Sequence, residues 1–326
     1  MENIIKYVIL VLFIAAVGAL IFMAGYSRSK TLALSDRTGQ SAGTLQSDYE
    51  APPEVKSGSR KAEALAGNTV PSSPDKKEAA EAREKAGQYA KEHPEAAEKE
   101  ISEMSAYLTL PAGLSPENRR DHMLLLASKK QEAKKTGARA GAETVTMGLY
   151  PQREGTPEEP IEWRIIDRLD SKTVFVVSAN VLEYKAYDDE HKNETLSYFW
   201  YKSTLKKWLN VNFYNSAFSD EEKQRILTSD IMLQSGATVK DRVFVLHTEE
   251  AKLFFRDDRD RICLPTPRAK AQKPHYPGMG DADMWWARSN NNGLGTVTAQ
   301  GQVIDMVGPA GLYHLGVRPA MWIRLR

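Results

Sequence analysis

A polar and aromatic cluster near the C-terminal end of the sequence contains the residue types that recognise sugars or peptides. Its members are Trp285, Trp286, Arg288, Asn290, Asn291 and Asn292, with His275 and Tyr276 upstream and Arg318 downstream. Aromatic rings stack on the apolar faces of sugars, and amides form hydrogen bonds with hydroxyl groups or a peptide main chain. We therefore predict a ligand-binding surface at these positions.

Two features of the cluster have an alternative, purely structural interpretation. Adjacent residues of a strand point to opposite faces, so at least one of Trp285 and Trp286 is expected in the core. Arg288 and Arg318 are equally suited to pairing with buried carboxylates or carbonyl groups, in which case they hold the fold together and contact no ligand.

A charged run at residues 256–261, with the sequence RDDRDR, is one candidate for a cation site, and Asp281 and Asp283 are a similar one. Its three aspartates alternate with three arginines, so we expect these charges to neutralise one another at the surface. The histidines His191, His247, His275 and His314 lack the short spacings of a zinc site. No metal ligands are predicted.

Catalytic motifs are missing from the sequence. It contains no nucleophile elbow, no phosphate-binding loop and no dinucleotide fingerprint. Cys263 is the one cysteine, so there is no intrachain disulfide, and we expect it to act as a small buried hydrophobe. We predict no catalytic residues and no cofactor, and a non-catalytic role is the expectation.

The net charge of the chain bears on whether nucleic acid is a partner. The chain has 44 basic and 43 acidic residues, for a formal net charge of +1. Such a balance provides no field that attracts nucleic acid. We therefore expect no nucleic-acid partner.

The elements that must position the cluster follow from the distribution of apolar residues, and the first is a membrane anchor. Residues 8–25 are uncharged and almost wholly apolar, and Tyr7 and Tyr26 extend them to a length that spans a bilayer. An apolar run of this length exceeds that of a cleaved signal peptide. We predict a single-pass anchor within residues 1–30 that contacts the lipid bilayer through residues 7–26.

Two segments with different compositions follow the anchor. Residues 31–72 are rich in Ser, Gly, Thr, Ala and Pro, which predicts a disordered linker. Residues 73–140 are dominated by Ala, Glu and Lys, with Ser-Pro start signals at 73–74 and 115–116, which predicts a charged helical stalk. The stalk is interpreted as a spacer. Sustained heptads of large apolar residues are missing from residues 75–110, so a dimerising coiled coil is not favoured.

A compact domain is predicted for residues 141–326, because all six tryptophans lie beyond residue 160. Strands are expected at 144–150, 161–169, 173–179, 242–247, 284–289 and 296–307, the last with a turn at Gln300-Gly301, and in the final PAMWIRL. Helices are expected after Ser203, after Ser219, which forms a capping box with Glu222, and after Thr248. These strands and helices do not alternate as βαβ units, so the predicted fold class is α+β.

Six ordered blocks of the sequence carry a resemblance to a known family. They are GLYPQ (148–152), PIEWRIID (160–167), STLKKWLNVNFYNSAFS (203–219), RVFVLHTEEA (242–251), WWARS (285–289) and GVRPAMWIRL (316–325). This series resembles a bacterial family of domains of unknown function (DUF6273-like) over nearly all of residues 144–326. The family usually has Pro-Gly after its WWLRS, where this chain has Asn290–Asn292, so the loop here is expected to differ.

The WWxRS and GVRPA blocks further resemble C-type-lectin-like folds of the formylglycine-generating-enzyme branch. This resemblance implies a compact α+β domain with a loop-rich face. The calcium-binding triplets of lectins and the paired cysteines of the oxidases are missing, so neither chemistry is expected. Members of the family commonly follow an export signal or membrane helix, which favours an extracytoplasmic domain. Arg28, Lys30 and Arg37 after the span favour the opposite orientation.

These observations lead to one functional prediction and two alternatives. We predict a membrane-anchored envelope protein whose lectin-like domain recognises a glycan or protein ligand. One alternative is an enzyme with a dispersed active site in the C-terminal domain. The other is a structural or scaffolding protein assembled through its stalk. The sequence does not fix the oligomeric state.

Overall fold

The computed structural model describes residues 76–136, 143–190, 199–273, 284–290 and 293–326, all within a unit that spans Ala64–Arg326. No helix in these ranges is both long enough and apolar enough to cross a membrane. The anchor predicted within residues 1–30 and the linker predicted for residues 31–72 lie outside the described residues.

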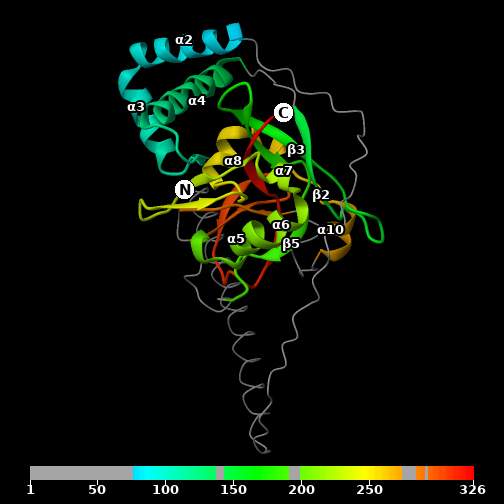
Figure 1. The fold of residues 1–326 in the computed structure, drawn as a ribbon. Coiled ribbons are helices and arrows are strands. Elements are labelled where there is room, and N and C mark those ends of the chain that lie inside the picture. Colours follow the sequence, from blue (N-terminus) through cyan, green and yellow to red (C-terminus); the bar gives the residue numbers. More distant parts are fainter. Residues whose placement is uncertain (1–75, 137–142, 191–198, 274–283, 291–292) are drawn as a thin grey trace, which may run out of the picture. The chain divides into compact units, whose positions relative to one another are not determined.

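Three helices open the described chain, as the sequence predicts. They are α2 (Lys76–Glu92), α3 (Pro94–Ser105) and α4 (Pro116–Thr136). Pro94 and Pro116 each occupy a first helical position, where a missing N–H is tolerated, and the Ser115 hydroxyl accepts a hydrogen bond from the Asn118 N–H at 3.1 Å. Both α2 and α3 pack against α4 (Figure 1).

The largest β-structure is a five-stranded sheet in the order β2-β3-β4-β13-β6, with every pair antiparallel. Its strands are β2 (Thr144–Tyr150), β3 (Glu159–Arg168), β4 (Thr173–Ser178), β6 (Ile226–Leu227) and β13 (Ala320–Arg324). Asp170 closes the β3–β4 turn by accepting from the main-chain N–H groups of Lys172 and Thr173, each at 2.7 Å. The strands predicted for this region are confirmed.

Two further sheets complete the β-structure of the described residues. A five-stranded sheet contains β5 (Glu183–Ala186), β9 (Trp285–Trp286), β10 (Leu294–Val297), β11 (Val303–Met306) and β12 (His314–Val317), in the order β11-β10-β9-β12-β5. A three-stranded sheet contains β1 (Leu110–Pro111), β7 (Ser229–Met232) and β8 (Thr238–Asp241). The hairpin turn predicted at Gln300-Gly301 joins β10 to β11. The fold is α+β, as predicted.

Short helices connect the strands. They are the 3₁₀ turn η1 (Trp200–Lys202), α5 (Thr204–Trp208), the π-helical turn η2 (Leu209–Phe213), α6 (Tyr214–Ala217), α7 (Asp220–Lys223), α8 (Thr248–Phe254), α9 (Asp258–Arg261) and α10 (Pro267–Gln272). The caps predicted at Ser203 and Ser219 are confirmed, and Glu222 completes the capping box.

One predicted strand and one predicted cap are wrong. Residues 242–247 form no ladder, because their main chain makes only isolated bridges, from Phe244 to Ala320 and from His247 to Arg288. The run is buried and largely apolar. A short buried apolar run has the same composition whether or not it forms a strand. The N-cap of α8 is His247, whose Nδ1 accepts from the Glu249 N–H at 3.1 Å, and Thr248 is the first helical residue.

The helical region differs from the spacer predicted for residues 73–140. Ile101, Met104, Leu108 and Leu110 are buried in the same hydrophobic core as the tryptophans of the domain. They are too few for a coiled coil, yet Ile101 and Met104, three residues apart, share one face of α3, and Leu108 and Leu110 follow in the segment after it. Residues from α3 onward therefore pack as part of the domain.

Candidate functional site

The tryptophans predicted to form a binding surface are core residues. Trp285 and Trp286 are both 0 % exposed. The Trp285 Nε1–H donates to the Arg261 carbonyl at 3.2 Å, and the Trp286 Nε1–H donates to the Lys185 carbonyl at 2.7 Å. Both indoles have found partners inside the protein, so neither ring is available for stacking on a ligand.

Arg318 is also buried, between two aromatic rings. Its guanidinium carbon lies 5.0 Å from the centre of the Phe255 ring and 5.2 Å from that of Trp285. The Nε–H donates to the Ser178 carbonyl at 2.9 Å, and burial lowers the pKa of Arg318 below its usual range. The structural interpretation of this arginine is therefore the one the geometry supports.

Arg288 and Asn290 contact the chain itself, at the segment that joins α3 to β1. Arg288 Nη2 lies 2.7 Å from Thr109 Oγ1 and 3.1 Å from Glu250 Oε2, and its Nε–H donates to the Val245 carbonyl at 2.8 Å. Asn290 donates to the Ala106 carbonyl at 2.9 Å. Residues 106–109 therefore contact both Arg288 and Asn290.

His247 lies at the edge of this buried network. It is 4 % exposed, its ring stacks on Tyr107 at 5.6 Å between centres, and its Nε2 is buried without a hydrogen-bond partner in the described structure. Burial, together with the charges of Arg288 and Lys252, lowers the pKa of His247 to about 3. The ring is therefore neutral at ordinary pH, and a neutral ring with its Nδ1 accepting from Glu249 carries its proton on Nε2.

The remaining residues of the predicted surface are His275, Tyr276, Asn291 and Asn292. They lie outside the described residues.

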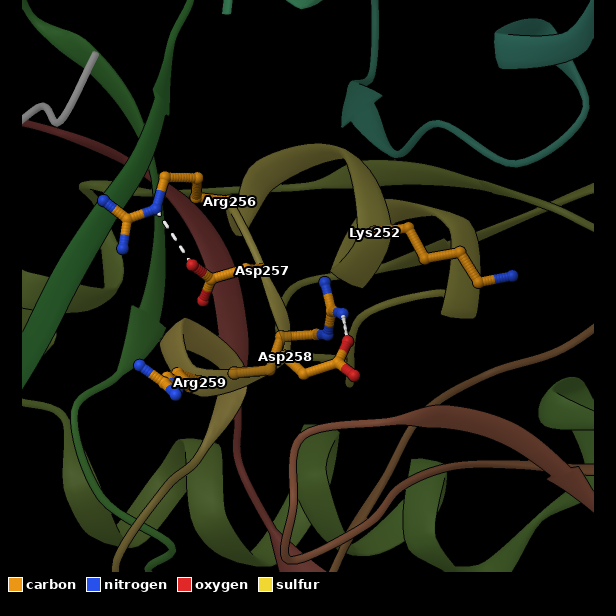
Figure 2. Close-up of a pocket in the computed structure, with 6 residues that line it drawn as sticks. Lys252, Arg256, Asp257, Asp258 and Arg259 are labelled. Atoms are coloured by element: carbon orange, nitrogen blue, oxygen red, sulfur yellow. Dashed lines mark hydrogen bonds and ion pairs between the residues drawn. The ribbon is translucent and has the colours of Figure 1, made fainter. Parts of the chain in front are cut away.

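A solvent-accessible hollow lies instead beside α8 and α9 (Figure 2). Its volume is about 590 Å³, and its lining consists of Lys252, Arg256, Asp257, Asp258, Arg259 and Arg261. Arg256 Nε donates to Asp257 at 3.1 Å, and Arg261 forms an ion pair with Asp258. The mutual neutralisation predicted for the run 256–261 is therefore observed for Asp257 and Asp258. The lining has four basic and two acidic side chains, and Lys252 pairs with Glu249 outside it at 2.7 Å.

The basic side chains of the hollow differ in how they are held. Arg261 is buried and fully engaged: its Nε–H donates to the Gly301 carbonyl at 2.7 Å and its Nη1 contacts the Ala251 carbonyl. Arg259 is exposed, and no ion pair is formed by its side chain within the described structure. In Figure 2, Arg256 and Arg259 extend to one side, and Lys252 extends to the other.

Local hydrogen bonds explain why this charged turn is ordered. Asp257 caps α9 by accepting from the Asp260 N–H at 2.9 Å, and that bond is the main cause that lowers the pKa of Asp257, with Arg256 adding to it. Asp260 in turn pairs with Arg164 of β3 at 2.9 Å. The turn is therefore held to the sheet that contains β3, and Arg256 and Arg259 project from a fixed base.

The chemistry available in the hollow is charge pairing and hydrogen-bond donation. Guanidinium groups recognise carboxylates and phosphates with two parallel hydrogen bonds, and lysine adds a point charge. The lining contains no His, Cys, Ser or Thr, and no group of three His, Cys, Asp or Glu residues suited to a metal ion occurs among the residues that the structure describes. Lys252 and Arg259 were not predicted as site residues, since alternating charges in sequence do not reveal which arginine stays unpaired.

A buried His–Asp pair lies elsewhere, between α4 and β3. His122 Nε2 is 2.7 Å from Asp167 Oδ2, and both side chains are 3 % exposed. Burial on its own would raise the pKa of Asp167, but the charge and hydrogen bond of His122 lower it below the usual range. Because both groups are enclosed, the pair fixes α4 to the sheet.

A comparison with known protein families identifies one region of the chain. Residues 171–325 match the model of a family described as a domain of unknown function (DUF6273). This match confirms the part of the predicted resemblance that concerns a domain-of-unknown-function family. No curated protein and no solved structure matches the chain, so the C-type-lectin-like fold stays a prediction.

Proposed function

We propose that this chain is a membrane-anchored envelope protein whose C-terminal domain recognises an acidic segment of a protein ligand, without catalysis, through the hollow beside α8 and α9. The observation that supports the proposal most is the excess of basic over acidic side chains in an accessible hollow of about 590 Å³. Each guanidinium carries several N–H donors, so Arg256 retains donors beyond the one given to Asp257.

A protein ligand is favoured over a glycan by what surrounds the hollow. Sugar sites commonly use an aromatic ring as a stacking platform, and the lining of this hollow contains none. Ile262 and Leu264 lie one and three residues after the end of α9 in sequence and are 43 % and 65 % exposed. Exposed apolar side chains next to cationic groups suit a polypeptide that carries both acidic and apolar residues.

Location at the membrane rests on the sequence alone. The apolar residues 8–25 would hold the chain in the bilayer, and an extracytoplasmic domain is the orientation favoured by the family resemblance. Protease treatment of intact cells tests the orientation: an extracytoplasmic domain is cleaved without permeabilisation, and protection until lysis contradicts this part of the proposal.

The binding proposal is tested with the full chain in detergent and fluorescent poly-L-glutamate. We expect saturable binding at 50 mM salt that weakens at 300 mM, because exposed charges are screened over about 10 Å at 0.1 M ionic strength. The double variant Arg256→Gln/Arg259→Gln should weaken binding by at least tenfold. Polygalacturonate and polyphosphate serve as parallel probes with carboxylates on sugars and with phosphates.

A matched control separates the hollow from general charge. Arg153→Gln/Arg242→Gln removes two exposed arginines elsewhere, one of which pairs with Glu159 as Arg256 pairs with Asp257. Equal losses in both double variants, or no binding of poly-L-glutamate by the wild type, would contradict a specific site. Binding of polygalacturonate alone would show that the ligand is a glycan and overturn the protein-ligand proposal.

A further inference from the structure

The segment 106–111, between α3 and the end of β1, is held by the domain mainly through its own main chain. Asn290 donates to the Ala106 carbonyl at 2.9 Å, the Thr109 N–H donates to Glu250 Oε1 at 2.6 Å, and the Trp322 Nε1–H donates to the Thr109 carbonyl at 2.8 Å. Leu110 and Pro111 then pair with Asp230 and Ser229 of β7 in an antiparallel ladder. Main-chain bonds of this kind do not depend on which residue supplies them.

Side chains add a sequence preference to these bonds. Leu108 and Leu110 are 6 % and 2 % exposed, so both enter the core. The hydroxyl of Thr109 accepts from Arg288 Nη2 at 2.7 Å, and Pro111 occupies the strand end. The pattern recognised is an apolar residue, threonine, an apolar residue and proline, all in an extended conformation.

The residues that hold the segment and the segment itself belong to different parts of the chain. Glu250, Arg288, Asn290 and Trp322 lie within residues 171–325, which match the family model, and residues 106–111 lie outside that region. The family region thus accepts an extended strand that it does not itself contain.

We propose that Glu250, Arg288, Asn290, Trp322 and the edge of β7 form a peptide-acceptor site, and that the segment 106–111 is its tethered occupant. The ligand class is an extended peptide with the apolar-Thr-apolar-Pro pattern. Tethering gives the chain's own segment an effective concentration in the millimolar range, so a free peptide at micromolar concentration binds only when that segment is weakened. The peptide-acceptor site shares no residue with the hollow beside α8 and α9.

The test uses the full chain with Thr109→Pro, which removes the N–H donor and the hydroxyl of the resident segment without adding a charge. A labelled peptide with the sequence of residues 104–113 is titrated and followed by fluorescence anisotropy. We expect saturable binding to the variant and none to the wild type at the same peptide concentration. The same peptide with an N-methyl group at the Thr109 position should bind at least tenfold more weakly, because it cannot donate to Glu250.

A second variant, Leu108→Ala/Leu110→Ala, weakens the resident segment through its apolar anchors and repeats the test if Thr109→Pro does not fold. Circular dichroism and cooperative unfolding establish that each variant is native. A folded variant that fails to bind the peptide overturns the proposal, as does equal binding of the native, N-methylated and scrambled peptides.

Discussion

Arg288 Nη2 lies 2.7 Å from Thr109 Oγ1 although the two residues are 179 positions apart in the sequence. The same nitrogen is 3.1 Å from Glu250 Oε2, and Glu250 Oε1 accepts a hydrogen bond from the Thr109 N–H. A buried cation, a buried anion and a main-chain segment thereby satisfy one another. This arrangement joins the helical region to the domain and engages Arg288, one of the residues predicted to bind a ligand.

The buried Arg288–Glu250 pair should show strong coupling in a double-mutant cycle. The Arg288→Met variant leaves Glu250 charged and buried without its cation, which is expected to lower the free energy of unfolding by about 3–5 kcal/mol. The Glu250→Gln variant should cost a similar amount, because it leaves Arg288 charged and buried, and its NH2 group replaces an oxygen that accepts from Arg288 and from the His247 N–H. In the double variant the loss should be smaller than the two single losses combined, by at least about 1 kcal/mol.

Chemical denaturation with urea measures these values in the full chain. Additive losses would indicate that the two charges act independently, contrary to the geometry. The exposed pair Arg153 and Glu159, at 3.7 Å, is a suitable control, since exposed pairs contribute roughly 0–1 kcal/mol.

His247 should make the fold less stable in mild acid. Its folded-state pKa of about 3 lies below the ordinary value of 6.5, so the unfolded chain binds a proton that the folded chain does not. The stabilisation is therefore complete above pH 6.5 and is lost as the pH falls towards 3. Between pH 7.5 and pH 5, this group alone should lower the free energy of unfolding by about 2 kcal/mol.

The variant His247→Asn isolates this contribution. Asparagine keeps an acceptor for the Glu249 N–H at the cap of α8 but does not titrate. Denaturation curves at pH 7.5 and pH 5 should therefore differ less for the variant than for the wild type. An unchanged difference would assign the acid sensitivity to other groups.

Asp167 acts at lower pH than His247, because its lowered pKa places its loss of stabilisation below about pH 4.

Sequence patterns predict those elements whose causes are local. The strands β2, β3 and β4 follow from runs rich in β-branched and aromatic residues and from the turn at Asp170, and the helix starts at Ser203 and Ser219 follow from capping chemistry. The turn at Gly301 follows from its dipeptide. Each of these signals lies within a few residues of the feature that it predicts.

The candidate site depends on contacts that are distant in sequence, and these were not predicted. The burial of both Trp285 and Trp286 requires cover on both faces of a two-residue strand, which no local pattern specifies. In the same way, the hydrogen bonds from Arg288 to Thr109 and Glu250 depend on how α3 and α8 pack on the domain, which the sequence around Arg288 does not specify. The residues 242–247 were predicted as a strand because buried apolar runs have the same composition whether or not they form a ladder.

Gly301 should be the most sensitive glycine near the hollow. Its φ of +81° favours glycine, and a Cβ placed there would lie 1.6 Å from the Asp258 carbonyl oxygen of α9. The variant Gly301→Ala must therefore move α9, the base from which Arg259 projects, or the hairpin turn that holds Arg261 through the Gly301 carbonyl. We expect a loss in the free energy of unfolding well above the roughly 1–2 kcal/mol cost of a left-handed alanine.

Gly155→Ala is the matched control for this prediction, because Gly155 has a φ of +68° and no atom within 4 Å of its added Cβ. The Gly155→Ala variant has the backbone strain of a positive φ but no steric clash at its Cβ. Thermal unfolding of the two variants should show a larger fall in Tm for Gly301→Ala, and weaker poly-L-glutamate binding for that variant alone. Equal falls in Tm would show that α9 and the hairpin turn yield without cost, so that the base of the hollow is not rigid.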